Sequence, residues 1–226
     1  MKTDSDPSQP SSQLSDYFAP LALRVITPRL TLQLPSGPEL YQLLHVIERG
    51  IHDPSQMPFI NAWTDLPSPR RERESLARWW RLRAEWTARD WRWSGAVHVE
   101  DSILGVQDLV GLDFLKTRQV KTASWLGLEY QGQGLGREMR EAVLHLAFTE
   151  LGATHALSGY LEGNVSSQKV SESLGYVATG VEDVEVRGRL VRNTTLVLER
   201  SAWEPHRRDD IIVEGLDECR EWFGLD

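Results

Sequence analysis

The fold of this chain is decided by one segment, Tyr130-Gln131-Gly132-Gln133-Gly134-Leu135-Gly136-Arg137-Glu138-Met139. The segment follows an apolar, strand-like run and leads into residues 134–151, where apolar side chains recur at helical spacing. Three glycines at alternate positions leave several backbone N–H groups unpaired at the positive end of this helix, with no Cβ atoms to keep a ligand away. The segment therefore predicts an anion site, and a pyrophosphate is the anion that fits it best.

The glycine spacing argues against two common nucleotide sites. A P-loop needs Lys followed by Ser or Thr after its last glycine, whereas Arg137-Glu138 follows Gly136. A dinucleotide-binding fold needs Gly-x-Gly-x-x-Gly in a parallel βαβ unit, and here Gly-x-Gly-x-Gly follows three antiparallel-type strands. A tight turn without a ligand stays open as an alternative, although each glycine weakens a helix start unless the backbone must approach something closely.

Helix and strand patterns alternate on both sides of this segment. Apolar residues at helical spacing predict helices over residues 38–48, 70–89, 134–151 and 165–174. Strand patterns cover residues 21–34, 93–99, 103–115, 120–129, 155–161, 176–186 and 190–199, with a further strand suggested at 211–213. The long loop at residues 50–69 has the length of a binding loop. This order predicts an α+β (mixed α/β) sheet with one helix inserted after its fourth strand.

Composition sets the domain limits and the class of protein. We expect a disordered arm at residues 1–20, one domain at 21–205 and a C-terminal extension at 206–226. No apolar run approaches the roughly 18–20 residues that cross a bilayer, and no secretion signal opens the chain. Cys219 is the only cysteine, which favours a reducing cytoplasm. The formal net charge of −8 argues against nucleic-acid partners, so local N–H groups and a few cations must hold an anionic ligand.

Two motifs together resemble the GNAT superfamily of N-acyltransferases. The glycine-rich segment is similar to the acyl-CoA pyrophosphate loop of that superfamily. The second motif resembles the segment after the fifth strand in the RimJ/RimL-type branch, and it reads Asn164-x-x-Ser167-x-x-Val170-x-x-x-Leu174-Gly175-Tyr176. The run Trp125-Leu126-Gly127 is also similar to small actinobacterial acetyl- and succinyltransferases. The resemblance covers roughly residues 23–203.

The resemblance implies a fold and an activity. The GNAT fold has a central, mostly antiparallel sheet of about seven strands, splayed between strands 4 and 5 and flanked by about four helices. The implied reaction moves an acetyl group, or a succinyl group, from CoA to a primary amine by direct transfer in a ternary complex. The acceptor would be a protein N-terminus, a lysine or a small amine. The co-substrate is acetyl-CoA or another acyl-CoA, no metal is expected, and a homodimer or higher homo-oligomer is the expected assembly.

The resemblance also implies which residues hold CoA. Backbone N–H groups of the glycine-rich loop would bind the pyrophosphate, and the end of the fourth strand would pair with the pantetheine arm. The implied binding residues are Leu126, Gly127, Leu128, Gln131, Gly132, Gln133, Gly134, Leu135, Gly136, Arg137, Asn164 and Ser167.

Acylation of an amine requires a neutral amine, a polarised thioester carbonyl and a proton for the departing thiolate. A backbone N–H near Leu128 is the candidate oxyanion donor. Ser167 is the candidate acid, with helix capping or a CoA contact as the alternative. Many relatives carry a carboxylate in the fourth strand, and residues 121–125 contain none. The base candidates are Glu129, Asp113, Asp108 and His98, and a water chain is the alternative because amines with pKa near 8 are partly neutral.

The acceptor side is expected between the 50–69 loop, the following helix and the last hairpin. Asn61, Trp63 and Trp93 are candidates to line it. Arg187 and Arg189 in the hairpin turn are candidates to attract an acidic group, or are simply exposed turn residues. Two other classes of function stay open: a non-catalytic acyl-CoA-binding regulatory module, which the missing carboxylate supports, and a nucleotide-binding protein that is not a transferase.

Overall fold

The glycine-rich segment joins strand β5 (Gln119–Leu126) to helix α4 (Leu135–His145) in the computed structural model, which describes residues 13–225. The other strands are β1 (Arg24–Ile26), β2 (Thr31–Gln33), β3 (Trp91–Val99), β4 (Ser102–Gly111), β6 (His155–Leu161), β7 (Val177–Val186), β8 (Arg189–Glu199) and β9 (Ile212–Glu214). The other helices are α1 (Gly37–Arg49), α2 (Arg70–Ala84), α3 (Phe114–Thr117), α5 (Val165–Ser173) and α6 (Arg200–Trp203). A π-helical turn (Leu146–Glu150) extends α4.

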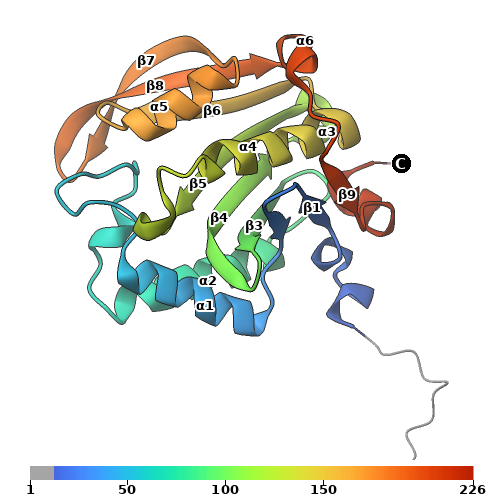
Figure 1. Cartoon of the computed structure of the whole chain (residues 1–226), viewed down its shortest axis with the longest axis horizontal. Helices are drawn as coiled ribbons and strands as arrows, with labels where there is room; N and C mark the ends of the chain where they lie inside the picture. The colour runs from blue at the N-terminus through green and yellow to red at the C-terminus, as the bar shows by residue number, and fades with distance from the viewer. Residues whose placement is uncertain (1–12, 226) are drawn as a thin grey trace, which may run out of the picture.

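Across the described residues, the strands form one sheet of nine in the order β7-β8-β6-β5-β4-β3-β2-β1-β9. Neighbours pair antiparallel except β5 and β6. Helix α4 packs on one face above the larger core, and α1 and α2 cover the other face (Figure 1). The predicted α+β GNAT-type sheet is therefore confirmed, with nine strands in place of about seven.

One of the two additional strands has a local cause, and the other comes from the distant C-terminal segment. Thr27-Pro28-Arg29 divides the expected first strand into the short antiparallel pair β1 and β2. The C-terminal segment then adds β9 to the outer side of β1, so the predicted extension is part of the sheet. The strand suggested at residues 211–213 is thus present as Ile212–Glu214.

The N-terminal arm is ordered where the structure describes it. Residues 13–21 form two short 3₁₀ turns, and the Phe18 ring lies 5.0 Å from Trp222 and 5.6 Å from Trp86. The expected disorder of residues 13–20 is therefore wrong, because these turns pack on the C-terminal segment. Residues 1–12 lie outside the described part. None of the helices in residues 13–225 is long and apolar enough to cross a membrane.

The parallel pair β5–β6 creates the opening that matters for function. It pairs at only three positions, from Gln119↔His155 to Lys121↔Leu157. Both strands continue, to Leu126 and Leu161, without further pairing to each other. The sheet is therefore splayed at the carboxyl ends of these strands, beside the start of α4.

Candidate functional site

The glycine-rich loop presents a row of unpaired backbone N–H groups. Within residues 13–225, no acceptor is found for the N–H groups of Gln133, Gly134, Leu135 and Gly136. Gly134 is the N-cap of α4 and has a φ of +79°, a left-handed conformation that glycine adopts readily. Consecutive amides at the positive end of a helix form an anion-binding concavity. The loop therefore has the geometry that its sequence predicts.

Two residues of the loop use a donor group in hydrogen bonds within the protein. The Arg137 N–H donates to the carbonyl oxygen of Gly134 at 3.2 Å, so the prediction that it binds the pyrophosphate is wrong for this group. The Gln131 side chain donates through Nε2 to the carbonyl oxygens of Ile51 (2.8 Å) and Leu126 (2.9 Å). Gln131 thus fastens the start of the 50–69 loop to the end of β5.

The end of β5 directs backbone groups toward β6. The Gly127 N–H donates to the Leu104 carbonyl oxygen at 2.8 Å. Because bonded and non-bonded pairs alternate along an antiparallel ladder, Ser124 and Leu126 turn their N–H groups away from β4 and into the splayed opening. The Leu128 N–H donates to Gly50 O at 3.0 Å, so the predicted oxyanion donor at Leu128 is engaged elsewhere. Leu126 has the N–H group in the required place.

Arg140 crosses the splayed opening from the α4 side. Its Nη1 donates to Ser158 Oγ on β6 (3.1 Å), and its Nη2 donates to Ser124 Oγ on β5 (3.3 Å). The side chain is 4% exposed, its Nε has no acceptor, and no carboxylate of the described residues lies within ion-pair distance. A buried cation without a counter-ion is costly. Sequence reasoning missed Arg140, although helical spacing from Gly136 to Val143 places it on the covered side of α4.

Asn164 and Ser167 begin helix α5. The Asn164 Oδ1 accepts the Ser167 N–H at 3.1 Å, so Asn164 is the capping residue and Ser167 is not. Ser167 is half-buried, and its hydroxyl has no partner within the described chain. A Cβ on Gly136 would lie 3.9 Å from Cγ2 of Val170, one turn after Ser167. Ser167 therefore lies on the side of α5 that faces the start of α4.

Of the carboxylates predicted as bases, Glu129 is ion-paired and Asp113 lies far from the splayed opening. Glu129 is exposed and lies 2.8 Å from Nε of Arg49. Asp113 follows β4 at the end where Gly111 pairs with Val120, about 20 Å from Leu126 by strand rise. That distance rules Asp113 out as a base.

The other two candidates are also occupied. Asp108 accepts hydrogen bonds from Ser94 Oγ (2.5 Å) and Arg78 Nη2 (3.0 Å). Burial lowers the pKa of His98, although Glu39 at 3.6 Å acts in the opposite direction. His98 lies in β3 opposite Thr31 of β2, and β4 separates β3 from the opening.

On the opposite face of the sheet, the 50–69 loop holds aromatic side chains near β5. The Trp63 ring lies 6.3 Å from Trp125 and 5.7 Å from Phe59. Asn61 is exposed in the same loop. Trp93 is 0% exposed in the core under α4, so its predicted place on the acceptor side is wrong: alternation along β3 turns it to the other face. Trp125 was missed, although the same alternation along β5 places it opposite Leu126.

Arg187 ties the last hairpin to this loop. It donates to both carboxylate oxygens of Asp65, at 2.6 and 2.7 Å, and to the Pro54 carbonyl oxygen. The hydrogen bonds from Arg187 lower the pKa of Asp65. Arg187 is therefore not available to an acidic acceptor, while Arg189 stays exposed in the turn.

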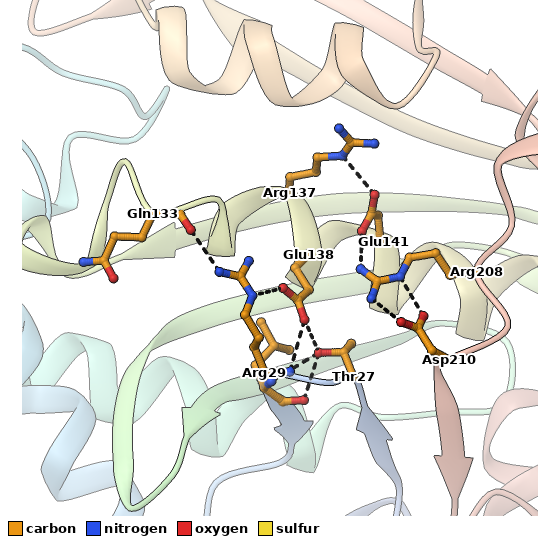
Figure 2. A network of polar contacts seen from close by, with 9 residues as sticks. Thr27, Arg29, Gln133, Arg137, Glu138, Glu141, Arg208 and Asp210 are labelled. Carbon is orange, nitrogen blue, oxygen red and sulfur yellow. Dashed lines mark hydrogen bonds and ion pairs between the residues drawn. The ribbon is translucent and has the colours of Figure 1, made fainter.

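A surface cavity of about 470 Å³ opens beside Gly134. Its lining residues are Arg29, Gly134, Arg137, Glu138, Glu141, His206 and Arg208. Figure 2 shows the polar contacts among its charged residues Arg29, Arg137, Glu138, Glu141 and Arg208. Burial would raise the pKa of Glu138, but hydrogen bonds from Thr27 and Arg29 outweigh it and lower the pKa. Glu138 is thus an anion that holds the β1–β2 turn against α4. No group of three or more His, Cys, Asp or Glu residues in the described part is placed to hold a metal ion.

Comparisons with known proteins agree with this geometry. The family model described as an acetyltransferase (GNAT) domain matches residues 29–177. Mycobacterium smegmatis RimJ, solved in complex with CoA-disulfide, is 14% identical with a TM-score of 0.65, over 88% of this chain and 91% of that one. Vibrio fischeri ribosomal-protein-S5-alanine acetyltransferase is 16% identical (TM-score 0.63; 80% and 98% covered). RimL, a ribosomal L7/L12 alpha-N-protein acetyltransferase solved with CoA, is 11% identical, with a TM-score of 0.62 over 77% of this chain and 96% of that one. At these identities the likeness shows the fold.

Proposed function

Because this chain belongs to the GNAT acetyltransferase family, and is therefore an acyltransferase, we propose that it moves an acetyl group from acetyl-CoA to a primary amine within a ternary complex. The observation that carries this proposal is that unpaired N–H groups lie in two places, at residues 133–136 of the glycine-rich loop and at Leu126 in the splayed opening. A pyrophosphate at the loop brings a thioester to the opening at the end of β5. RimJ, RimL and the S5-alanine enzyme are similar in fold, and RimL, an alpha-N-protein acetyltransferase, favours a protein N-terminus as the first acceptor to test.

Each part of the reaction has a candidate group. The amine enters from the side of Trp63 and Trp125 and attacks the thioester carbonyl, whose oxygen accepts a hydrogen bond from the Leu126 N–H. A C–N bond forms and the C–S bond breaks. The ammonium proton passes to water, since each candidate carboxylate is paired or lies away from the opening. Ser167 donates its proton to the thiolate and regains a proton from water.

The experiment is a thiol-release assay with acetyl-CoA, succinyl-CoA and a panel of N-terminal peptides, lysine peptides and small amines. We expect release of free CoA that requires both a donor and an amine, together with acylated product by mass spectrometry. Saturable CoA binding with no turnover on any acceptor would identify a regulatory module instead. Tight binding of ATP or NAD without binding of CoA would identify a nucleotide-binding protein.

Succinyl-CoA is a second candidate donor because of Arg140. Its buried guanidinium, without a counter-ion, lies at the apex of the opening, where the far carboxylate of a succinyl chain would supply one. If so, Arg140→Gln should lower kcat/KM for succinyl-CoA at least about tenfold more than for acetyl-CoA, since it removes a charge-assisted pair. Arg140→Lys keeps the charge and should keep part of the preference. An unchanged ratio in both variants would leave Arg140 as a brace between Ser124 and Ser158.

Ser167→Ala should lower kcat by about tenfold or more while the Kd for CoA changes less than about threefold, because the hydroxyl would act on the leaving thiolate. Pre-steady-state turnover and calorimetric titration with CoA measure the two quantities. Ser166→Ala is the matched control, since Ser166 is the exposed neighbour in the same helical turn. Equal losses in turnover and affinity would make Ser167 a CoA contact only.

A further inference from the structure

The 50–69 loop is tied to both sides of the splayed opening. On the β5 side, the Gln131 side chain donates to the Ile51 carbonyl oxygen at 2.8 Å. On the other side, Arg187 in the turn of the β7–β8 hairpin donates to Asp65. That turn lies toward the carboxyl end of β6, because β8 runs antiparallel to β6 and the turn precedes it. The loop therefore spans the opening from β5 to the hairpin, and Figure 1 shows it beside the hairpin turn.

Between these two anchors the loop is held together by contacts of its own. His52 Nε2 lies 2.8 Å from Thr64 Oγ1, and the His52 ring lies 5.7 Å from the Phe59 ring. The Phe59 ring lies 5.7 Å from Trp63. Asp65 belongs to the same 3₁₀ turn as Trp63. A contact made at Asp65 therefore fixes the place of the aromatic side chains as well, because the turn moves as one unit.

Trp63 connects the loop to the place of acyl transfer. Its ring lies 6.3 Å from Trp125, the residue directly before Leu126 in β5. The amine has to pass these rings to reach a thioester beside the Leu126 N–H. The loop also has two exposed side chains, Ile60 and Asn61, which offer an apolar and an amide contact to a chain longer than a small amine. The position of the loop therefore affects how a peptide acceptor is held.

Arg187 departs from the residue preference of its own turn. Val186 pairs with Arg189, so Arg187 and Gly188 form a two-residue hairpin turn, with φ of +51° and +71°. Turns of this kind favour Asn, Asp or Gly at their first position, because other side chains rarely adopt a positive φ. An arginine here strains the backbone. The gain that offsets the strain is its contact with Asp65, which indicates that the side chain serves to hold the loop.

The contact between Arg187 and Asp65 fixes geometry more than it stabilises the fold. Nε and Nη2 of Arg187 donate to the two carboxylate oxygens of Asp65 at 2.7 and 2.6 Å, and Nη1 donates to the Pro54 carbonyl oxygen at 3.2 Å. Paired hydrogen bonds of this kind are directional as well as strong. Both side chains are partly exposed, and an exposed ion pair contributes little to folding stability. Loss of the contact should therefore release the loop without unfolding the protein.

We propose that Arg187 is a positioning residue for a peptide acceptor: its contact with Asp65 holds the 50–69 loop across the splayed opening as a wall along which the chain behind the amine lies. The inference rests on the proposed acyl transfer. A peptide loses this wall when the contact is lost. A small amine is too short to use it, and the groups that hold acyl-CoA do not contact Arg187.

Steady-state kinetics with acetyl-CoA, the best peptide and the best small amine of the panel test this inference. Arg187→Asn removes the cation and suits the left-handed backbone of the turn. We expect KM for the peptide to rise at least about fivefold, and KM for acetyl-CoA and for the small amine to stay within about twofold. Asp65→Asn should have the same effect. The exchanged pair, Arg187→Asp with Asp65→Arg, should bring KM for the peptide back within about twofold of the wild type.

Arg192→Gln is the matched control, since Arg192 is an exposed arginine of β8 in the same hairpin and its side chain has no hydrogen bond or ion pair within residues 13–225. It should leave all three KM values unchanged. Hydrogen exchange over residues 50–69 should increase in Arg187→Asn and not in Arg192→Gln, which reports release of the loop independently of turnover.

Three results would overturn the inference and leave the proposed function intact. They are an unchanged KM for the peptide in Arg187→Asn, an equal rise in KM for acetyl-CoA, and a wild type that acylates small amines but no peptide. Absence of turnover by the wild type on every acceptor would overturn the proposed function, and this inference with it.

Discussion

Replacement of Gly134 by valine is expected to abolish CoA binding while the sheet and helices stay folded. A Cβ at this position meets only Arg29 Nη2, at 3.4 Å, so the protein itself accommodates the first carbon. The valine branches would then fill the space in front of the N–H groups of Gly134 to Gly136, where the pyrophosphate must lie. Loss of two charge-assisted hydrogen bonds predicts a fall in affinity of about 100-fold or more.

The matched control for this prediction is Gly152→Val at the far end of the same helical segment. Gly152 has a φ of +69° and open space around its Cβ position, so it shares the backbone strain of Gly134 without the ligand. That strain is of order 1–3 kcal/mol, within the stability of an ordinary domain. Calorimetry with CoA and thermal unfolding separate the two effects. Unchanged CoA affinity in Gly134→Val would show that the ligand lies elsewhere.

Replacement of Gly105 by alanine is expected to reduce the free energy of unfolding by about 3 kcal/mol or more. Gly105 lies opposite Leu126 in the β4–β5 ladder, and its Cβ would come within 2.2 Å of the Trp125 carbonyl oxygen and 2.8 Å of the Leu126 Cα. These are backbone atoms, which cannot rotate aside. The end of β5 must shift, and with it the Leu126 N–H that faces the opening, so turnover should fall as well.

Urea unfolding and the acyl-transfer assay measure these two effects. Gly180→Ala is the control, because the nearest atom to its Cβ position is Thr195 Oγ1 at 3.2 Å, a side-chain atom on the exposed β7–β8 hairpin. It should cost less than about 1 kcal/mol. If the two replacements reduced the free energy of unfolding by similar amounts, the view that the β4–β5 pair sets the position of Leu126 would be contradicted.

Periodicity in the sequence predicts the order of elements well and their ends less well. The apolar spacing before Gly152 predicts α4 with its π-helical extension, and the alternating runs predict β3 to β8. The pairing of β9 with β1 depends on contacts between parts of the chain far apart in sequence. Such pairings leave little trace in a local pattern.

The candidate site shows the same division between local and distant causes. Glycine spacing alone located the loop whose unpaired N–H groups are the proposed anion site. It did not show that the N–H groups of Arg137 and Leu128 bond to Gly134 and Gly50, since backbone partners follow from chain geometry. Asp113 and Trp93 were chosen for their residue types alone. The sequence did not show that Asp113 follows the far end of β4, or that Trp93 points to the face of the sheet under α4.

By itself the sequence determined the α+β class, the helix that follows the glycine-rich loop and the glycines at the start of that helix, because these depend on residues adjacent in the chain. The tertiary structure alone decided which N–H groups face the opening, that Arg140 lies there without a counter-ion, and that Arg208 near the C-terminus reaches Glu141. The physical reason is distance along the chain. Backbone conformation is set by neighbouring residues, whereas the partners of a buried charge or an amide come from segments that only the folded sheet brings together.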